Sequence, residues 1–285
     1  MKGPAMSNDP DGTQRAMVVF TDLDGTLLDS KTYSFEAARE ALTELRARDI
    51  PLIVVSSKTR AEIEPIRLEL RNEHPFIVEN GGAVVIPTNY FPFSLTDAVR
   101  RGSYHVVEMG IPYPLLRTAL KEIQQRLGIE LRGYGDMSVE EIAARTGLSL
   151  KNAHLSKQRD SDEPFVMEDS TCPEERLIEA INERGLRYTK GDRFYHLMGH
   201  HDKGQAVRYL IRCYRRQIDD DHRVLSSVAI GNSLNDLPML EAVDRPILVQ
   251  QTDGSYALDI ELPRLIRAPG PGPAGWNQAV LSLLP

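Results

Sequence analysis

The sequence is poor in cysteine and has no long apolar run. Its 285 residues include two cysteines, Cys172 and Cys213, which lie far apart and match no zinc-ligand spacing. Neither a disulfide framework nor a structural zinc site is therefore expected. No stretch of about 18 apolar residues is present, and the N-terminus lacks the apolar segment of a secretory signal. These absences predict a soluble, cytoplasmic protein.

An excess of positive charge is also absent. Lysine and arginine number 34 against 41 aspartate and glutamate residues, so the formal net charge is −7. A chain with this balance is not expected to bind nucleic acid or an anionic membrane through a broad surface. An anionic small molecule would need a local basic pocket.

What the sequence does contain is an alternation of strand and helix patterns. Apolar segments at 17–22, 51–56 and 76–80 are separated by helical patterns at 34–48 and 59–71. This order predicts parallel βαβ units, and strands that are apolar on both faces predict helices on both sides of the sheet. We expect an α/β protein with a doubly wound, mostly parallel Rossmann-like sheet.

The middle of the chain breaks this alternation. It carries strand patterns at 104–108 and 164–168, helical patterns at 114–127 and 174–184, two short helices between them, and a hairpin at 186–198. This order predicts an inserted α+β domain. The expected organisation is a flexible N-terminal tail (1–16), the first part of the core (17–86), the insert (87–197) and the second part of the core (198–285).

Two carboxylates follow the first apolar strand. Asp22 and Asp24 are two residues apart, and Gly25 allows the backbone to turn sharply after them. Close like charges need a cation, and Mg²⁺ suits them because it prefers oxygen ligands. One carboxylate can then attack phosphorus while the other handles the proton. An isolated Asp-x-Asp is more often only a polar turn, so the rest of the chain must decide.

Further polar motifs follow in order along the chain. Ser56 and Asn80 come directly after two other apolar strands, and doubly wound sheets bind ligands at the carboxyl ends of their strands. Lys203 begins a helix, where a positive charge is unfavourable unless a nearby anion compensates for it. The last motif is the polar loop 231–236, which follows a fourth apolar strand.

Together, these motifs resemble the haloacid dehalogenase superfamily of phosphohydrolases, and the insert looks like the α/β cap of its Cof-type, subclass IIB members. The segments at 76–82, 133–136, 191–196, 234–238 and 271–275 make the chain similar to the family of mannosyl-3-phosphoglycerate phosphatases. The resemblance implies a small-molecule sugar phosphate substrate, which such enzymes convert to phosphate and mannosylglycerate, a compatible solute.

The resemblance also implies roles for individual residues. Asp22 would be the nucleophile that forms an aspartyl-phosphate, and Asp24 would be the acid and then the base. Ser56 would hydrogen-bond a phosphoryl oxygen, and Lys203 would neutralise the charge of the transition state.

The cofactor implied by the resemblance is Mg²⁺, with ligands from Asp22, the Asp24 backbone carbonyl and the loop that contains Asn232 and Asp236. The family usually has aspartate where this chain has Asn232. We therefore expect weaker Mg²⁺ binding or a greater reliance on Asp236.

Specificity is expected to come from cap groups and from residues beside the core motifs. Arg193 is the first choice for a substrate carboxylate because a guanidinium matches a carboxylate in shape, although it also fits an exposed hairpin residue. The full set of expected substrate contacts is Lys58, Arg60, Glu79, Asn80, Gly133, Tyr134, Gly135, Asp136, Arg193 and His196.

Alternative functions stay open from the sequence. A glucosyl-3-phosphoglycerate or another sugar phosphate could be the substrate of the same chemistry. A sugar phosphomutase would share the fold but would need a bisphosphate activator. A non-catalytic binding module is a third class, and Asn232 is the only argument for it.

Overall fold

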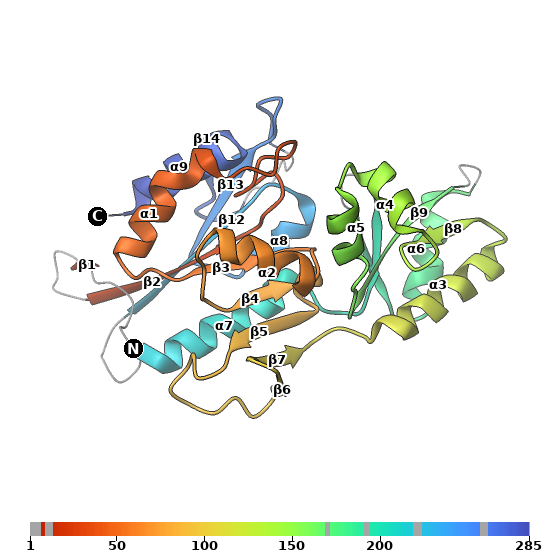
Figure 1. The fold of residues 1–285 in the computed structure, drawn as a ribbon, viewed down its shortest axis with the longest axis horizontal. Coiled ribbons are helices and arrows are strands. Elements are labelled where there is room, and N and C mark those ends of the chain that lie inside the picture. Colours follow the sequence, from red (N-terminus) through yellow and green to blue (C-terminus); the bar gives the residue numbers. More distant parts are fainter. Residues whose placement is uncertain are drawn as a thin grey trace.

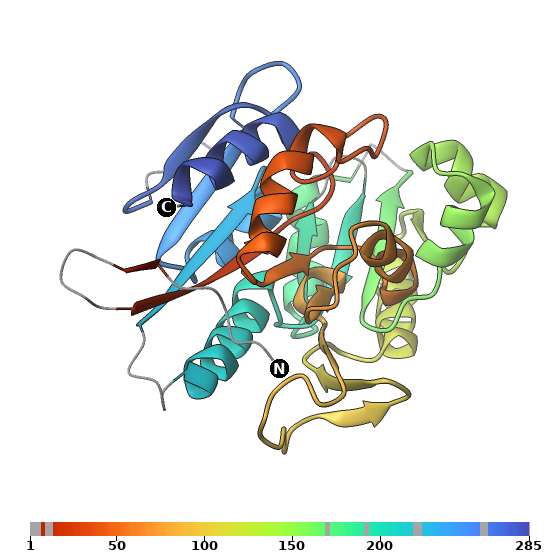
Figure 2. The same ribbon diagram turned by 60° about the vertical axis from the view of Figure 1, so that its left-hand side comes forward.

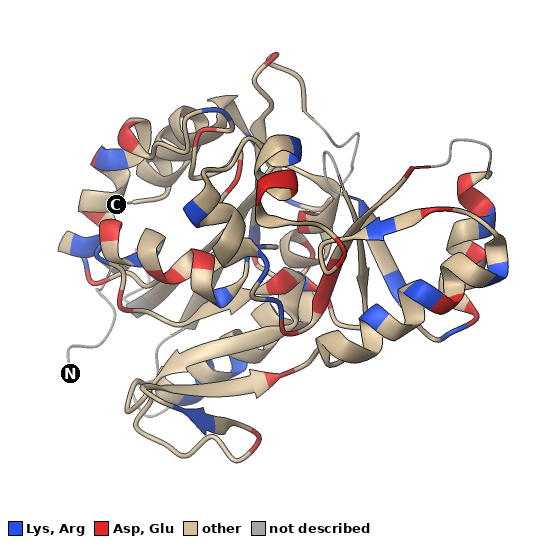
Figure 3. Cartoon of the chain, turned by 45° about the vertical axis from the view of Figure 1, so that its right-hand side comes forward, with Lys and Arg blue, Asp and Glu red and all other residues tan. Residues whose placement is uncertain are grey.

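The structure is a computed structural model that describes residues 7–8, 14–168, 172–190, 194–218, 224–256 and 262–284. It has two lobes, each built on its own β-sheet (Figure 1). The middle of the chain forms the smaller lobe, at the right of that view. Lysine and arginine are interspersed with aspartate and glutamate over both lobes (Figure 3). Among the described residues, no helix is long and apolar enough to cross a membrane.

The larger lobe contains a 10-stranded sheet with the order β14-β13-β12-β2-β3-β4-β5-β7-β6, and β1 pairs with β2. Neighbouring strands from β14 to β4 are parallel, and those from β4 to β6 are antiparallel. The strands are β1 (Ser7–Asn8), β2 (Gln14–Thr21), β3 (Leu52–Val55), β4 (Phe76–Val78), β5 (Ala83–Pro87), β6 (Val99–Arg101), β7 (Tyr104–Glu108), β12 (Val224–Gly231), β13 (Arg245–Gln250) and β14 (Ile266–Pro271).

Helices cover both faces of this sheet (Figure 2). Val19 of β2 packs in a cluster with α1, α2 and α9, whereas Val18 and Phe20 pack with α7 and α8. This arrangement confirms the expected doubly wound, mostly parallel sheet, and it explains why central strands such as β3 (LIVV) and β4 (FIV) are apolar on both faces. The helices are α1 (Arg39–Ala47), α2 (Arg60–Glu69), α7 (Lys203–Ile218), α8 (Leu237–Leu240) and α9 (Gly272–Leu283).

The smaller lobe has an antiparallel sheet with the order β10-β11-β9-β8. Its helices bury their apolar residues in two clusters, one around Phe165 and one around Tyr134 and Phe194. The elements are α3 (Tyr113–Leu127), β8 (Leu131–Gly133), α4 (Val139–Thr146), α5 (Leu150–Ser156), β9 (Asp162–Met167), α6 (Glu174–Asn182), β10 (Arg187–Lys190) and β11 (Tyr195–Met198).

Two expected boundaries were wrong. The strand at 104–108 was assigned to the insert that starts at 87, but β6 and β7 extend the large sheet, so the second sheet belongs to the chain after Glu108. A short hairpin strand has the same pattern in either sheet, so the sequence could not place it. In the expected tail, Ser7–Asn8 pair with Gln14 and Arg15, while residues 1–6 and 9–13 lie outside the described residues.

Candidate active site

A buried lysine joins two carboxylates at the carboxyl edge of the large sheet. Asp22 directly follows β2, Lys203 begins α7, and Asp236 ends the short helix η4 (Leu234–Asp236) after β12. Lys203 Nζ donates to Asp22 Oδ1 at 2.7 Å and to Asp236 Oδ1 at 2.7 Å. The sequence placed Lys203 at an unfavourable helix start, and these two anions compensate for its charge.

The protonation of this trio is set by burial and by the mutual charges. Burial raises the pKa of Asp22 to about 7, and repulsion from Asp236 adds to the rise, while Lys203 opposes it. Burial alone would lower the pKa of Lys203, but attraction to Asp22 and Asp236 outweighs burial and raises that pKa. Lys203 therefore stays charged. A further cation beside Asp22 would lower the pKa of Asp22 and favour the ionised carboxylate.

Asp236 holds the loop after β12 in shape. Its Oδ2 accepts hydrogen bonds from Asn232 N at 2.9 Å, Ser233 N at 3.0 Å and Ser233 Oγ at 3.2 Å. Gly231 is required here because a Cβ at that position would lie 2.5 Å from the Asp236 Cβ. Both Asp236 oxygens are thus engaged, one by the loop and one by Lys203.

Asp24, two residues after Asp22, pairs with a lysine. Its Oδ2 is 2.8 Å from Lys58 Nζ, whereas its Oδ1 is buried with no hydrogen-bond partner among the described residues. Lys58 N donates to Ser56 Oγ at 3.2 Å. Thr59, the residue after Lys58, forms a capping box with Glu62 at the start of α2. The loop that holds Ser56 and Lys58 is therefore fixed by β3 at one end and by this capping box at the other.

The oxygens near Asp22 suit a hard divalent cation. Among the described residues, no group of three or more histidine, cysteine, aspartate or glutamate side chains is placed to hold a metal. The Asn232 amide lies against Gly25, where a Cβ would overlap it, so it stands beside the Asp22–Asp24 loop. Asp22, Asp24 and Asn232 all line the same cavity and carry oxygens, which are the ligand type that Mg²⁺ prefers.

A cavity of about 520 Å³ opens in front of Asp22 between the two lobes. The larger lobe contributes the two aspartates and Lys58 to its wall. The smaller lobe contributes side chains that include Tyr134, Arg159 and His196. This volume lies in the range of small-molecule sites, which bury most of a drug-sized ligand.

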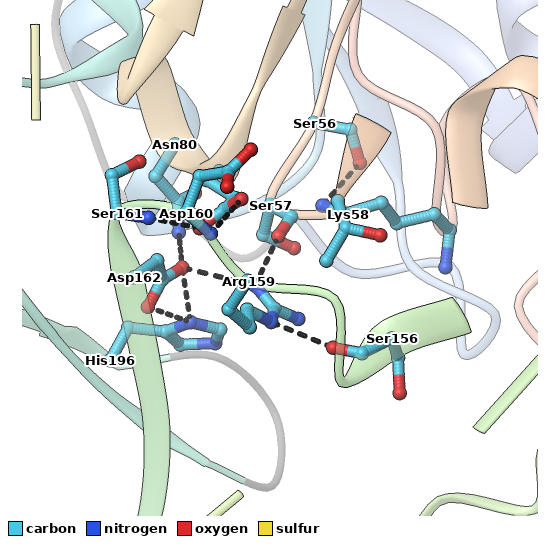
Figure 4. A network of polar contacts seen from close by, with 12 residues as sticks. Ser56, Ser57, Lys58, Asn80, Ser156, Arg159, Asp160, Ser161, Asp162 and His196 are labelled. Atoms are coloured by element: carbon cyan, nitrogen blue, oxygen red, sulfur yellow. Dashed lines mark hydrogen bonds and ion pairs between the residues drawn. The ribbon is translucent and has the colours of Figure 1, made fainter. Parts of the chain in front are cut away.

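A buried carboxylate joins the lobes beside this cavity (Figure 4). Asp162, at the start of β9, accepts a hydrogen bond from Asn80 Nδ2 at 3.1 Å and one from His196 Nδ1 at 2.9 Å. Arg159 Nη1 is 3.5 Å from the same carboxylate. Asn80 Oδ1 in turn accepts from Asn235 Nδ2 at 3.1 Å, which ties this junction to the loop after β12.

Glu79 makes a second link between the lobes. Its fully buried carboxylate accepts hydrogen bonds from Asp160 N at 2.9 Å and from Ser161 N at 2.8 Å. Burial raises the pKa of Glu79 to about 7, although Arg159 opposes this rise. The residue therefore holds the chain that enters β9 rather than lining the cavity.

The expected substrate contacts divide into two groups. Lys58, Tyr134 and His196 line the cavity, and Asn80 lies at the junction just described. Arg60 does not line it, because it extends along α2 to within 3.9 Å of Glu64.

The glycine-rich loop after β8 also lies outside the cavity, apart from Tyr134. Asp136 Oδ1 accepts from Arg117 Nη2 at 2.7 Å, and Gly133 and Gly135 give the Arg117 side chain the space that a Cβ would fill. The loop thus anchors an arginine of α3. Arg193, the first choice for a carboxylate contact, lies outside the described residues.

Arg159 was missed by the sequence reasoning. It stands in the polar run 156–161 between α5 and β9, which has the composition of an exposed loop. Its side chain is 5% exposed, and its Nη1 donates to Ser57 O at 2.9 Å, next to the expected phosphate-binding Ser56. No local signal marks it, because its burial depends on contact between the two lobes.

Comparisons with known proteins agree with this geometry. A family model described as haloacid dehalogenase-like hydrolase matches residues 19–94. The chain is 46% identical over 267 residues to the glucosyl-3-phosphoglycerate/mannosyl-3-phosphoglycerate phosphatase of Methanococcoides burtonii, with 94% of this chain and 97% of that protein covered. It is 39% identical to the mannosyl-3-phosphoglycerate phosphatase of Pyrococcus furiosus, with 81% of this chain and 90% of that protein covered.

Solved structures share the fold. A haloacid dehalogenase-like hydrolase from Bacteroides thetaiotaomicron matches with a TM-score of 0.59 and 17% identity, covering 94% of this chain and 99% of that one. At this identity, the similarity supports the fold alone.

Proposed function

Because the chain belongs to the haloacid dehalogenase-like hydrolases, we propose that it removes the phosphate from glucosyl-3-phosphoglycerate and mannosyl-3-phosphoglycerate. Relatives that are 46% and 39% identical carry these substrates in their names. The observation that carries the proposal is the Asp22 carboxylate, which faces a cavity of about 520 Å³ while Lys203 holds its Oδ1 at 2.7 Å.

Asp22 would act as the nucleophile. Because Lys203 fixes Oδ1, the other carboxylate oxygen is the one that attacks phosphorus. A bond forms between Asp22 and phosphorus as the bond to the glycerate oxygen breaks, which gives an aspartyl-phosphate that water then hydrolyses. Lys203 stays beside the phosphoryl group and offsets the charge that develops in each step.

Asp24 would transfer the protons. Lys58 holds Asp24 Oδ2 at 2.8 Å, and the carboxyl group lines the cavity. It would protonate the leaving glycerate and then accept a proton from water. Ser56 Oγ accepts from Lys58 N, which leaves its O–H free to donate to a phosphoryl oxygen. Mg²⁺, bound by Asp22, the Asp24 carbonyl and Asn232, would neutralise charge on the phosphoryl oxygens.

The proposal is tested by phosphate release from mannosyl-3-phosphoglycerate, glucosyl-3-phosphoglycerate, mannose 6-phosphate and 3-phosphoglycerate in the presence of Mg²⁺. We expect turnover of the two glycosyl-3-phosphoglycerates and a loss of ~10³-fold or more in Asp22→Asn. Asp97→Asn is a matched control, because Asp97 is exposed, accepts a hydrogen bond from Tyr209 Oη at 2.9 Å and does not line the cavity. Equal turnover of all four compounds would contradict the substrate assignment, and full activity in Asp22→Asn would contradict the nucleophile.

A further inference from the structure

Arg159 is a buried cation in the wall of the cavity that Asp22 faces. Its Nη1 donates to Ser57 O at 2.9 Å, and its Nε donates to Ser156 O at 2.9 Å (Figure 4). Its Nη2 makes no hydrogen bond to any residue that the structure describes. The guanidinium is therefore held in place by two carbonyl oxygens while part of its donor capacity stays unused.

Burial lowers the pKa of Arg159, but attraction to Asp162, Glu79 and Glu62 outweighs burial and raises that pKa. Even so, the ion pair with Asp162 is long, at 3.5 Å, and Asp162 is shared with Asn80 and His196. The other two cations of the described cavity wall have partners of their own. Lys58 lies 2.8 Å from Asp24, and Lys190 lies 3.1 Å from Glu174 on an exposed surface.

The chemistry of the proposed substrate fixes where its carboxylate must lie. In a 3-phosphoglycerate, the carboxylate carbon is joined through one further carbon to the carbon that carries the phosphate. A group that binds this carboxylate must therefore stand beside the phosphate-binding residues. Arg159 meets this condition because it contacts Ser57, the residue after Ser56.

From this geometry we infer that Arg159 binds the glycerate carboxylate and determines the specificity of the enzyme for glycosyl-3-phosphoglycerates. The inference rests on the proposed function. The planar guanidinium, already oriented by Ser57 and Ser156, presents its remaining N–H groups to a carboxylate in a fixed geometry. A sugar phosphate without the carboxylate leaves these N–H groups without an acceptor, so it is a poorer substrate.

The test compares two substrates in wild type and in Arg159→Met. One is mannosyl-3-phosphoglycerate, and the other is its counterpart with a hydroxymethyl group in place of the carboxylate. We expect the variant to lose ~10²-fold in kcat/KM with the carboxylate substrate, in line with the loss of one partner of a buried charge pair. The loss with the alcohol analogue should be several times smaller. Arg132→Met is the matched control, since Arg132 pairs with Glu141 at 2.6 Å and does not line the cavity.

The ratio of the two losses separates specificity from a structural role. A purely structural Arg159 would lower kcat/KM equally for both substrates, and that result would overturn the inference while leaving the proposed function intact. Wild-type enzyme that hydrolyses neither substrate would overturn both. If Arg159→Met does not fold, the same two substrates are compared in Arg159→Lys. This variant keeps the charge but loses the fork that matches a carboxylate, so we expect a smaller loss that is still greater with the carboxylate substrate.

Discussion

Replacing Glu79 by glutamine should remove a pH-dependent penalty on the stability of the protein. The Glu79 carboxyl is fully buried, and its pKa is raised from 4.5 to about 7. Between these two values, the folded state keeps a proton that the unfolded state has lost. The free energy of unfolding of the wild type therefore falls as pH rises through this window.

The size of the penalty follows from the two pKa values. A difference of about 2.5 pKa units corresponds to about 3 kcal/mol, absent below pH 4.5 and complete above pH 7. Glutamine carries no such proton, so the variant should gain stability relative to wild type as pH rises. Its stability at a single pH also reflects changed hydrogen bonds to Asp160 N and Ser161 N, so the pH dependence is the informative quantity.

Urea unfolding measured across this window tests the prediction. Trp276 is a suitable fluorescent probe, because it is fully buried and donates from Nε1 to Thr21 Oγ1 at 3.0 Å inside the larger lobe. We expect the difference in unfolding free energy between Glu79→Gln and wild type to change by about 2 to 3 kcal/mol between pH 5 and pH 8.5. A constant difference at all pH values would refute the assigned pKa of Glu79.

Three shorter predictions concern a buried ion pair, the expected metal ligand Asn232 and the buried Lys203. Arg117→Met leaves the fully buried Glu163 without its partner at 2.6 Å and should cost about 3 kcal/mol in urea unfolding; a cost under about 1 kcal/mol refutes this. Asn232→Asp adds a carboxylate and should raise Mg²⁺ affinity about tenfold by calorimetry, and an unchanged affinity contradicts the ligand assignment. Lys203→Met leaves Asp22 beside Asp236 without a counter-ion and should lower kcat by ~10²-fold or more, which unchanged turnover would disprove.

The parts of the fold that the sequence predicted are those with a local signal. The strand before Asp22 is apolar on both faces, and the structure places it inside the sheet between β12 and β3. The antiparallel strand β7 was assigned to the wrong sheet and β6 was not predicted, because strand pairing depends on contacts between distant segments. Patterns along the chain show that a strand exists but not which sheet it joins.

The candidate site, too, could be predicted only in part from the sequence. Asp22 and Lys203 were predicted as partners in one reaction, and their side chains are 2.7 Å apart although 181 residues separate them in the chain. Asp236 was expected to be a metal ligand, whereas its oxygens bind Lys203 and the loop backbone. Arg159 could not be found from the sequence, since only contact between the lobes buries it in the cavity wall.

The central claim, that Asp22 forms a covalent bond to phosphorus, can be tested directly by rapid quenching. Enzyme would be mixed with mannosyl-3-phosphoglycerate that carries a radiolabelled phosphate, stopped with acid within the first turnover, and treated with hydroxylamine, which cleaves acyl phosphates. We predict a substrate-dependent label on the wild type that hydroxylamine removes and that Asp22→Asn lacks. Turnover without such a label, or the same label on Asp22→Asn, would contradict the mechanism.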